Sequence, residues 1–229
     1  MCTIYLIRHG QASIGTSNYD VLSDLGRKQA DILGKYLDLI GLQFDHVVSG
    51  TLKRQIDTAC IATARTPETL PQNDAFNEYH HSKIFDHYAS RLAGENRAIA
   101  GTLSQGHNEK LTYQTFSTLM NAWVDDNKEH GDLESWDQFN SRIERGLTDI
   151  IERHGRDDTI AVFTSGGVIC TILQQSTHFP VTGIFELNWG IYNASISVLQ
   201  VNRSTPRLRS YNSVAHLELK KDPALITNI

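Results

Sequence analysis

Short apolar runs, each followed by a polar or glycine-containing loop and then by a helical pattern, recur along the chain. Three such runs lie at residues 4–7, 47–48 and 160–163. Runs of this kind are typical of strands buried in a parallel sheet. Alternating positions over 196–201, followed by a second segment at 207–211, predict a hairpin at the sheet edge. Strands that alternate with helices predict an α/β fold, a three-layer sandwich around a mostly parallel central sheet.

Apolar residues at helical spacing predict the helices that cover this sheet. The positions between Ser23 and Gly41 keep one face apolar at helical spacing, which predicts a helix. Ser23 is the expected N-cap of this helix, and Gly41 is expected to end it. Further helices are expected over residues 51–64, 133–154 and 168–175. Together with the strands, these helices account for the layers of the sandwich.

The middle of the chain has a different pattern. Two periodic pieces, around 85–99 and 113–128, are separated by a polar loop at 102–110. Neither piece is apolar enough to form a core of its own. We therefore expect a single domain over residues 1–229, with a helical insertion or cap at about 79–131 that lies over the functional site.

Polar side chains stand where each of the three buried runs ends. Arg8-His9-Gly10 follows the first run, residues 49–54 follow the second, and residues 164–167 follow the third. In open α/β sheets, ligands bind in the crevice beyond the carboxyl ends of the strands. We therefore expect these three segments to meet in space, although they are far apart in the sequence.

The residue types in these segments point to an anionic ligand. The guanidinium groups of Arg8 and Arg54 offer paired donors that match phosphate or carboxylate oxygens, and helix amino termini add partial positive charge. A neutral imidazole such as that of His9 can also act as a nucleophile toward phosphorus. Either Arg8 or His9 alone would be read as a surface or turn residue. Their position directly after a buried strand favours a functional role.

The same tripeptide occurs a second time, as Arg153-His154-Gly155. This copy ends an amphipathic helical pattern instead of a strand. Gly155 is then expected just after the helix, and the two basic side chains complement the helix dipole. We interpret this copy as a helix stop without chemistry. The pattern that precedes each copy, a strand or a helix, distinguishes the two copies, and the tripeptide alone does not distinguish them.

Composition narrows the classes of partner. The chain has 229 residues, 26 acidic and 21 basic side chains, a net charge of −5, and 40% apolar residues. A mildly acidic chain without a Lys/Arg run is a poor candidate for binding nucleic acid or a membrane surface. No apolar run approaches the roughly 18 residues of a membrane span. Arg8 comes too early for the apolar core of a signal peptide, so we expect a cytoplasmic protein.

Cysteine and histidine spacing gives little sign of a metal. The three cysteines are far apart and form no Cys-x-x-Cys pair, so neither a disulfide framework nor a zinc ribbon is expected. Glycine motifs for nucleotides and a His-Glu-x-x-His motif are absent from the sequence. His80, His81 and His87 lie near Glu78, but the adjacent pair would point apart. We expect no cofactor and no metal.

Several short motifs occur in an order that resembles a known family. The similar segments are residues 6–11 (Leu-Ile-Arg-His-Gly-Gln), 22–30 in the first helix, 49–59, 77–79 around an acidic residue, and 193–199, 211–212 and 216–217 in the closing strands. They resemble the histidine phosphatase superfamily, the phosphoglycerate-mutase-like proteins, over nearly the whole chain. A tripeptide alone is a weak signal, whereas this ordered set is specific.

The resemblance implies a role for each of four side chains. His9 would be the nucleophile that attacks the phosphoryl group, while Arg8 and Arg54 would hold its oxygens in the transition state. Glu78 would protonate the leaving oxygen and then help a water molecule attack the phosphohistidine.

One position departs from the family pattern. The second histidine, usually in a His-Gly pair after the third core strand, is replaced by Ser165, which the resemblance places with Gly166 in the phosphate-binding site. Serine donates one hydrogen bond but carries no charge. Loss of one preorganised donor has cost other enzymes about 10²–10³-fold in rate. Either the enzyme is slow, or another residue replaces the donor; the candidates in the insertion are His81, His107 and Arg91.

The leading hypothesis is a phosphomonoester phosphatase that acts through a phosphohistidine, on a small molecule or a phosphorylated protein. A first alternative is a pseudo-phosphatase that binds a phosphorylated ligand without turning it over. A second is a phosphoglycerate mutase, although the segment after His9 lacks the Trp-Asn pair of mutases and the region near Glu78 lacks their arginine cluster. The sequence specifies neither the substrate, which the insertion would select, nor the oligomeric state.

Overall fold

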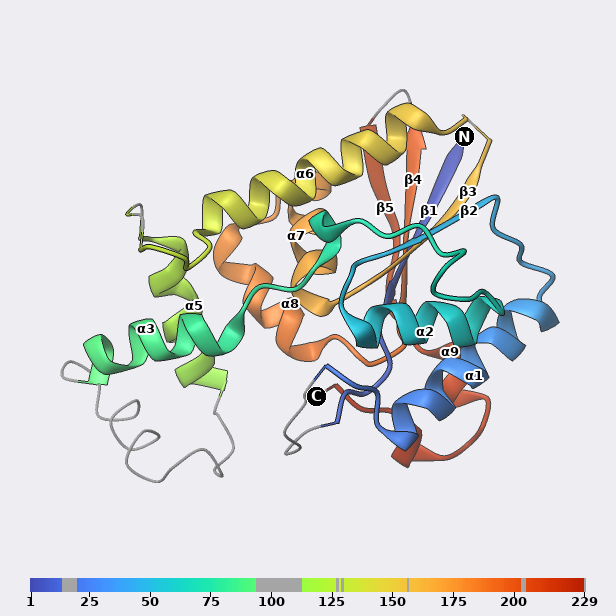
Figure 1. Cartoon of the computed structure of the whole chain (residues 1–229), viewed down its shortest axis with the longest axis horizontal. Coiled ribbons are helices and arrows are strands. Elements are labelled where there is room, and N and C mark those ends of the chain that lie inside the picture. The colour runs from blue at the N-terminus through green and yellow to red at the C-terminus, as the bar shows by residue number, and fades with distance from the viewer. Residues whose placement is uncertain are drawn as a thin grey trace.

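The computed structural model describes residues 1–13, 20–93, 113–126, 128, 130–155, 157–202 and 205–228. Within them, five strands form one sheet in the order β2-β3-β1-β4-β5 (Figure 1). The strands are β1 (Cys2–Arg8), β2 (His46–Ser49), β3 (Thr159–Thr164), β4 (Ile196–Asn202) and β5 (Thr205–Ser213).

The expectation of a mostly parallel sheet is met only in part, because the sheet is mixed. β2, β3 and β1 run parallel to one another, while β4 is antiparallel to both β1 and β5. The predicted edge hairpin is confirmed in β4 and β5. Strands joined in a hairpin are antiparallel neighbours. Among the described strands, β4 therefore runs against the other four, because β5 reverses direction again.

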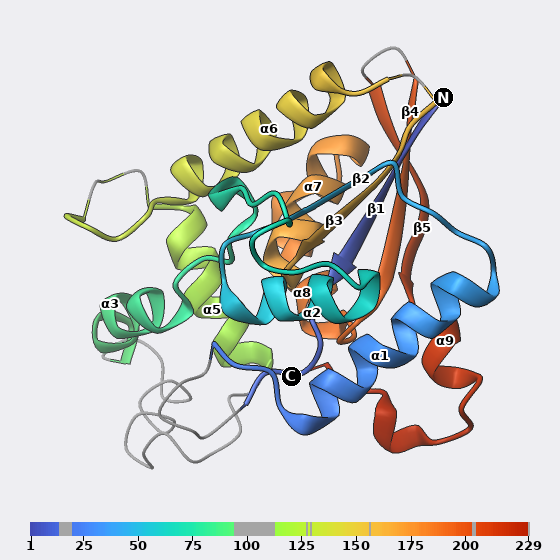
Figure 2. The same ribbon diagram turned by 45° about the vertical axis from the view of Figure 1, so that its right-hand side comes forward.

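Helices cover both faces of the sheet (Figures 1 and 2). The described helices are α1 (Asp24–Leu39), α2 (Lys53–Thr63), α3 (His81–Ala93), α5 (Tyr113–Val124), α6 (Trp136–Arg153), α7 (Gly166–Thr177), α8 (Ile184–Gly190) and α9 (Ala215–Glu218), with short 3₁₀ helices η1 (Asp74–Phe76), η2 (Val181–Gly183) and η3 (Pro223–Leu225). The predicted α/β fold is confirmed, with the sheet as its middle layer.

Alternate residues of the central strands face opposite layers. Ile4 and Leu6 of β1 belong to one apolar cluster with α6 and α7, whereas Ile7 belongs to a second cluster with α1 and α2. Because β1 and β3 are largely buried on both faces, their sequences are nearly continuous apolar runs.

The predicted ends of α1 agree with the structure. The hydroxyl of Ser23 accepts a hydrogen bond from the Gly26 amide at 3.0 Å, which makes Ser23 the N-cap. The helix ends at Leu39, and Gly41 follows with a φ of +65°, in the left-handed region that glycine adopts without strain.

The insertion contributes α3, which packs on α5, and α5, which packs on α6 and α8 (Figure 2). Tyr88 of α3 and Trp123 of α5 are each 1% exposed and share the apolar cluster of α6 and α7. The pieces predicted at 85–99 and 113–128 correspond to α3, described to residue 93, and to α5. The predicted loop at 102–110 lies outside the described residues. The single domain and the placement of the insertion over the site stay predictions.

Candidate active site

The carboxyl ends of β1, β2 and β3 meet at one edge of the sheet, and His9 lies there. Arg8 pairs with Thr164 across β1 and β3, and the His9 amide donates to the Thr164 carbonyl at 2.9 Å. On the other side, the Ala194 amide donates to the His9 carbonyl at 3.1 Å. Main-chain bonds to both neighbours therefore fix His9, and its side chain is buried.

Hydrogen bonds hold the imidazole of His9 in one tautomer. Nδ1 lies 2.7 Å from the carbonyl oxygen of Gly10, which can only accept, so Nδ1 carries the proton. Nε2 is then unprotonated and accepts a hydrogen bond from Nε of Arg54 at 3.2 Å. The ring nitrogen with an available lone pair is thus the one that faces Arg54.

The surroundings of His9 keep its imidazole neutral. Burial, and then the positive charges of Arg54 and Arg8, lower the pKa of His9 well below its ordinary value of 6.5. The hydrogen bond to Gly10 opposes this shift without reversing it. At neutral pH the side chain is therefore unprotonated and able to act as a nucleophile.

Gly10 allows the loop after β1 to pass against the first turn of α1. A Cβ atom on Gly10 would lie 2.4 Å from the carbonyl oxygen of Gly26, and one on Gly26 would lie 2.1 Å from the carbonyl oxygen of Gln11. Only two glycines permit this approach of the two main chains. The close packing fixes the residue that follows His9.

Arg54 lies in the first turn of α2 and is only 7% exposed, with its guanidinium directed at His9. Nη1 of Arg54 pairs with Oδ1 of Asp20 at 2.8 Å. Oδ2 of Asp20 accepts from the main-chain amide of Lys53 at 2.9 Å, at the positive end of the helix dipole. Asp20 therefore orients Arg54, a role that the sequence alone did not reveal.

Arg8, the last residue of β1, is held from the other side of the site. Its Nη1 donates to the carbonyl oxygens of Ile191 and Asn228, the latter at 3.0 Å. A Cβ atom on Gly166 would lie 3.6 Å from Nε of Arg8, so the guanidinium lies beside the start of α7.

Glu78 follows η1 and is directed at the start of α7. Its Oε2 accepts from the Gly167 amide at 2.9 Å, and its Oε1 accepts from the Tyr79 amide at 3.2 Å. Burial raises the pKa of Glu78, and the Gly167 amide and the charges of Arg54 and Arg8 only partly offset this effect. A carboxyl group with a raised pKa suits a general acid.

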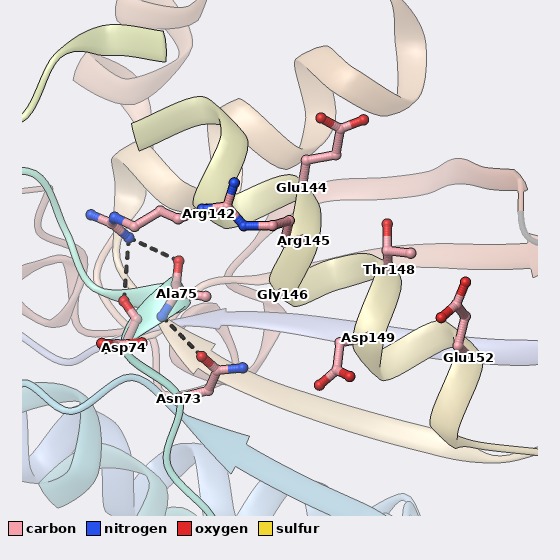
Figure 3. A pocket seen from close by; sticks show the side chains of 10 residues that line it. All are labelled: Asn73, Asp74, Ala75, Arg142, Glu144, Arg145, Gly146, Thr148, Asp149 and Glu152. Atoms are coloured by element: carbon pink, nitrogen blue, oxygen red, sulfur yellow. Dashed lines mark hydrogen bonds between the residues drawn. The ribbon is translucent and has the colours of Figure 1, made fainter. Parts of the chain in front are cut away.

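Arg142 of α6 holds the segment that leads into Glu78. Its Nη1 donates to three carbonyl oxygens of that segment, at 3.3 Å for Asp74, 2.8 Å for Ala75 and 2.9 Å for Asn77. Figure 3 shows the bonds to Asp74 and Ala75 at the end of a surface groove between α6 and η1. Glu134 accepts two bonds from the same guanidinium and orients it.

The third predicted segment supplies the amino end of α7. Ser165 is the N-cap residue of this helix and is fully buried. A Cβ atom on Gly167 would lie 2.3 Å from Oε1 of Glu78, and one on Gly166 would lie 2.4 Å from Oδ1 of Asn188. A side chain at either glycine would therefore displace Glu78 or Asn188 from the start of the helix. A helix amino end in this place attracts an anion.

The three residues considered as substitutes for a second histidine differ in location. Arg91 pairs with Asp126 at 3.3 Å and lies over the ring of Tyr88, so it is engaged within the insertion. His81 begins α3, and its pKa is lowered by desolvation and then by the charge of Arg54. His107 lies outside the described residues.

The second Arg-His-Gly copy lies at the opposite end of the sheet. α6 ends at Arg153, which confirms that this copy terminates a helix. The ring of His154 stacks on that of His46, the first residue of β2, with centroids 3.8 Å apart. His9 and His154 are therefore separated by the length of the parallel strands.

Within the part of the chain that the structure describes, two His/Asp groups have donor atoms close enough to hold a metal ion. They are His46, His154 and Asp158, and His87, Asp126 and His130, with donor atoms within 4.8 Å of one another in each group. In the first group, the two imidazole rings stack on each other, and Nε2 of His46 lies 3.1 Å from Oδ2 of Asp158. In the second group, the Arg91 guanidinium already occupies Asp126. Neither group includes His9 or Glu78.

Solved structures with a similar fold cover almost the whole chain. A Bacillus stearothermophilus protein, YhfR, matches with a TM-score of 0.65 and 19% identity, over 95% of this chain and all of that one. A putative alpha-ribazole-5'-P phosphatase from Escherichia coli matches with a TM-score of 0.64 and 21% identity, over 93% and 96% of the two chains. A mycobacterial glucosyl-3-phosphoglycerate phosphatase matches with a TM-score of 0.61 and 21% identity, over 92% and 98%.

Curated relatives match a shorter stretch. The serine/threonine-protein phosphatase PGAM5, mitochondrial, of Xenopus tropicalis is 40% identical over 67 residues, 28% of this chain and 24% of that protein. Its human counterpart is 38% identical over 66 residues, 28% and 23% of the two proteins. The chain thus matches about a quarter of the length of these relatives.

A family model covers most of the chain. The model of the histidine phosphatase superfamily (branch 1) matches residues 4–110 and 97–214, which include the first Arg-His-Gly motif, Arg54 and Glu78. The relatives and the structural neighbours described above include phosphatases. This chain belongs to the histidine phosphatase superfamily, branch 1.

Proposed function

We propose that this protein is a phosphomonoester phosphatase that acts through a phosphohistidine on His9. The observation that carries the proposal is the tautomer of His9. Its Nδ1 proton is held by the Gly10 carbonyl, and its unprotonated Nε2 lies 3.2 Å from Nε of Arg54. An unprotonated, buried nitrogen beside a guanidinium is positioned to attack a phosphorus atom whose oxygens the guanidinium binds.

The proposed reaction has two steps. First, Nε2 of His9 forms a bond to phosphorus while the ester P–O bond breaks, and Glu78 gives its proton to the leaving oxygen. Next, a water molecule attacks the phosphohistidine, its proton returns to Glu78, and the N–P bond breaks to release inorganic phosphate. Arg8 and Arg54 bind the phosphoryl oxygens in both steps, with Ser165 and the amino end of α7 completing the site.

Two classes of substrate are consistent with the comparisons. The PGAM5 relatives are named serine/threonine-protein phosphatases, which supports a phosphorylated protein. The structural neighbours include phosphatases of small molecules, which supports a small phosphomonoester. We propose that the insertion at about 79–131 selects between them.

A turnover assay on the full chain tests the proposal. We expect release of inorganic phosphate from p-nitrophenyl phosphate, and a faster release from one class when phosphoserine peptides, phosphothreonine peptides and small phosphomonoesters are compared. Binding of phosphate without turnover would favour the pseudo-phosphatase instead. Transfer of the phosphoryl group to a second hydroxyl, with little free phosphate, would favour the mutase.

We predict that Arg142→Leu lowers kcat, because the main-chain carbonyls before Glu78 lose the hydrogen bonds that Arg142 donates to them. A displacement of a catalytic group by about 1 Å can cost on the order of 10²-fold, so we expect a loss between about 10-fold and 10²-fold with little change in KM. Arg145→Leu is the matched control, because Arg145 lines the same groove (Figure 3). Equal losses of kcat in both variants would contradict a role of Arg142 in positioning Glu78.

The location of the protein is a separate proposal. Among the described residues, the helices are too short or too polar to cross a membrane. The curated relatives are named as mitochondrial proteins, but they match over about a quarter of their length. A cytoplasmic location stays a prediction, to be tested by imaging a tagged full-length chain.

A further inference from the structure

Ser165 stands where the family resemblance places a second histidine, and its surroundings indicate how a hydroxyl serves there. Nε2 of Gln55 lies 2.8 Å from Oγ of Ser165, and both side chains are fully buried. A hydroxyl has one hydrogen to donate and lone pairs that accept. Because Gln55 donates to the oxygen, the hydrogen of Ser165 is directed elsewhere. Within the described part of the chain, that hydrogen has no protein acceptor.

The orientation of the Gln55 amide follows from its other partners. Nε2 also donates to the carbonyl oxygen of Phe76 at 3.0 Å, and Oε1 accepts from the amide of Leu52 at 3.3 Å. The reverse orientation would set acceptor against acceptor and donor against donor. Gln55 therefore presents an N–H group to Ser165. Both of its N–H groups are then used within the protein.

The main chain places the Gln55–Ser165 pair next to both proposed phosphate-binding arginines. Gln55 follows Arg54 in α2, and Ser165 follows Thr164, the residue paired with Arg8 across the sheet. The start of α7, directly after Ser165, lies beside the Arg8 guanidinium, as the Gly166 contact distance shows. A hydrogen that leaves Ser165 on the side away from Gln55 is thus in the neighbourhood where the phosphoryl oxygens would bind.

The geometry points to Gln55 as a positioning residue that directs the Ser165 hydroxyl as a donor toward the phosphoryl group. Gln55 does not touch the substrate and acts through Ser165. The pair takes the place of the missing histidine, in preference to a residue of the insertion. This inference rests on the proposed function, because the proposed phosphate chemistry identifies the ligand.

Vanadate affinity, measured by calorimetry on the full chain, tests the pair. Vanadate mimics the transferred group but has no leaving group, so binding does not depend on proton donation by Glu78. We expect Ser165→Ala and Gln55→Met each to weaken binding about fivefold, the worth of one neutral hydrogen bond. The double variant should also lose about fivefold, because Gln55 acts only through the hydroxyl. A double variant whose vanadate affinity falls about 25-fold, the product of the two single losses, would overturn the inference.

Conservative and control variants separate positioning from folding. Ser165→Thr keeps the hydroxyl and is expected to bind vanadate within about twofold of the wild type. Gln175→Leu is the matched control, because it removes an amide that donates to Asn140 at the far end of α7. If Gln55→Met does not fold, Gln55→Asn withdraws the same amide and carries the same expectation. A loss in the Gln175 variant equal to that of the Gln55 variant would also overturn the inference.

The binding readout keeps the two proposals apart. A wild-type chain that binds vanadate with the expected non-additivity but releases no phosphate would contradict the phosphatase proposal and leave the role of Gln55 standing. If the wild type turns over phosphomonoesters but the losses in vanadate affinity of the two single variants multiply in the double variant, the phosphatase proposal stands and the inference about Gln55 is contradicted. Absence of vanadate binding by the wild type would overturn the inference about Gln55.

Discussion

The His9→Ala variant is expected to lose at least about 10⁴-fold in kcat on every phosphomonoester, because removal of a nucleophile leaves only the binding groups of a site. Arg8, Arg54 and the start of α7 stay in place in this variant, so it should still bind vanadate. Turnover is measured as phosphate released from p-nitrophenyl phosphate. Retention of more than about a tenth of wild-type activity would contradict covalent catalysis by His9.

Labelling locates the covalent intermediate. After mixing with a ³²P-labelled phosphomonoester and quenching in alkali, the label should be found within residues 1–27 and be absent from the His9→Ala variant. Label on the peptide that contains His154 would contradict the separation of the two Arg-His-Gly copies. His178→Asn is the matched control, because His178 is an exposed left-handed C-cap at which asparagine is tolerated.

The Glu78→Gln variant is expected to lose about 10²–10⁴-fold in kcat on an alkyl phosphate, because glutamine cannot protonate the leaving oxygen. On p-nitrophenyl phosphate the loss should be much smaller in the first step, since nitrophenolate leaves without a proton. The two substrates are compared under single-turnover conditions, which isolate that step. Equal losses on both substrates would show that Glu78 positions the phosphoryl group instead of donating a proton.

The pH profile follows from the directions of the two pKa shifts. The pKa of His9 is lowered, so the imidazole becomes unprotonated, and active, at a lower pH than a free histidine. The pKa of Glu78 is raised, so its carboxyl keeps the proton that it must donate to a higher pH than a free glutamate. Activity should therefore rise as pH passes the pKa of His9 and fall as it passes that of Glu78, and Glu78→Gln should remove the falling limb.

The strands and the meeting of the three polar segments could be predicted because both follow from local pattern. Buried runs such as 160–163 specify strands, and parallel strands bring their carboxyl ends to one edge. The expected meeting of His9 and Arg54 agrees with the 3.2 Å hydrogen bond between them. The antiparallel pairing of β4 with β1 could not be predicted, because the direction in which β4 joins β1 depends on long-range pairing and not on the alternation within β4.

The residues that orient the site could not be predicted, because their partners are distant in the sequence. Asp20 contacts Arg54 across 34 residues, and Arg142 contacts Asn77 across 65. An acidic residue in a polar loop and an arginine on a helix have the pattern of solvated side chains. Gln55 differs from these two residues, because its local sequence does indicate a role at the site: it is a polar residue on the buried face of α2, directly after Arg54.

The contact between Gln55 and Ser165 has a consequence for how such a site can evolve. An imidazole at position 165 would enter the fully buried space in which Nε2 of Gln55 lies 2.8 Å from the serine oxygen. Exchange of serine for histidine alone would therefore collide with the glutamine, while exchange of the glutamine alone would leave the hydroxyl without direction. If the inference about Gln55 holds, the two positions are expected to be epistatic, so that an exchange between serine and histidine at position 165 also requires a change at position 55. Relatives that carry a histidine after the third core strand are then expected to lack a glutamine at the position of Gln55.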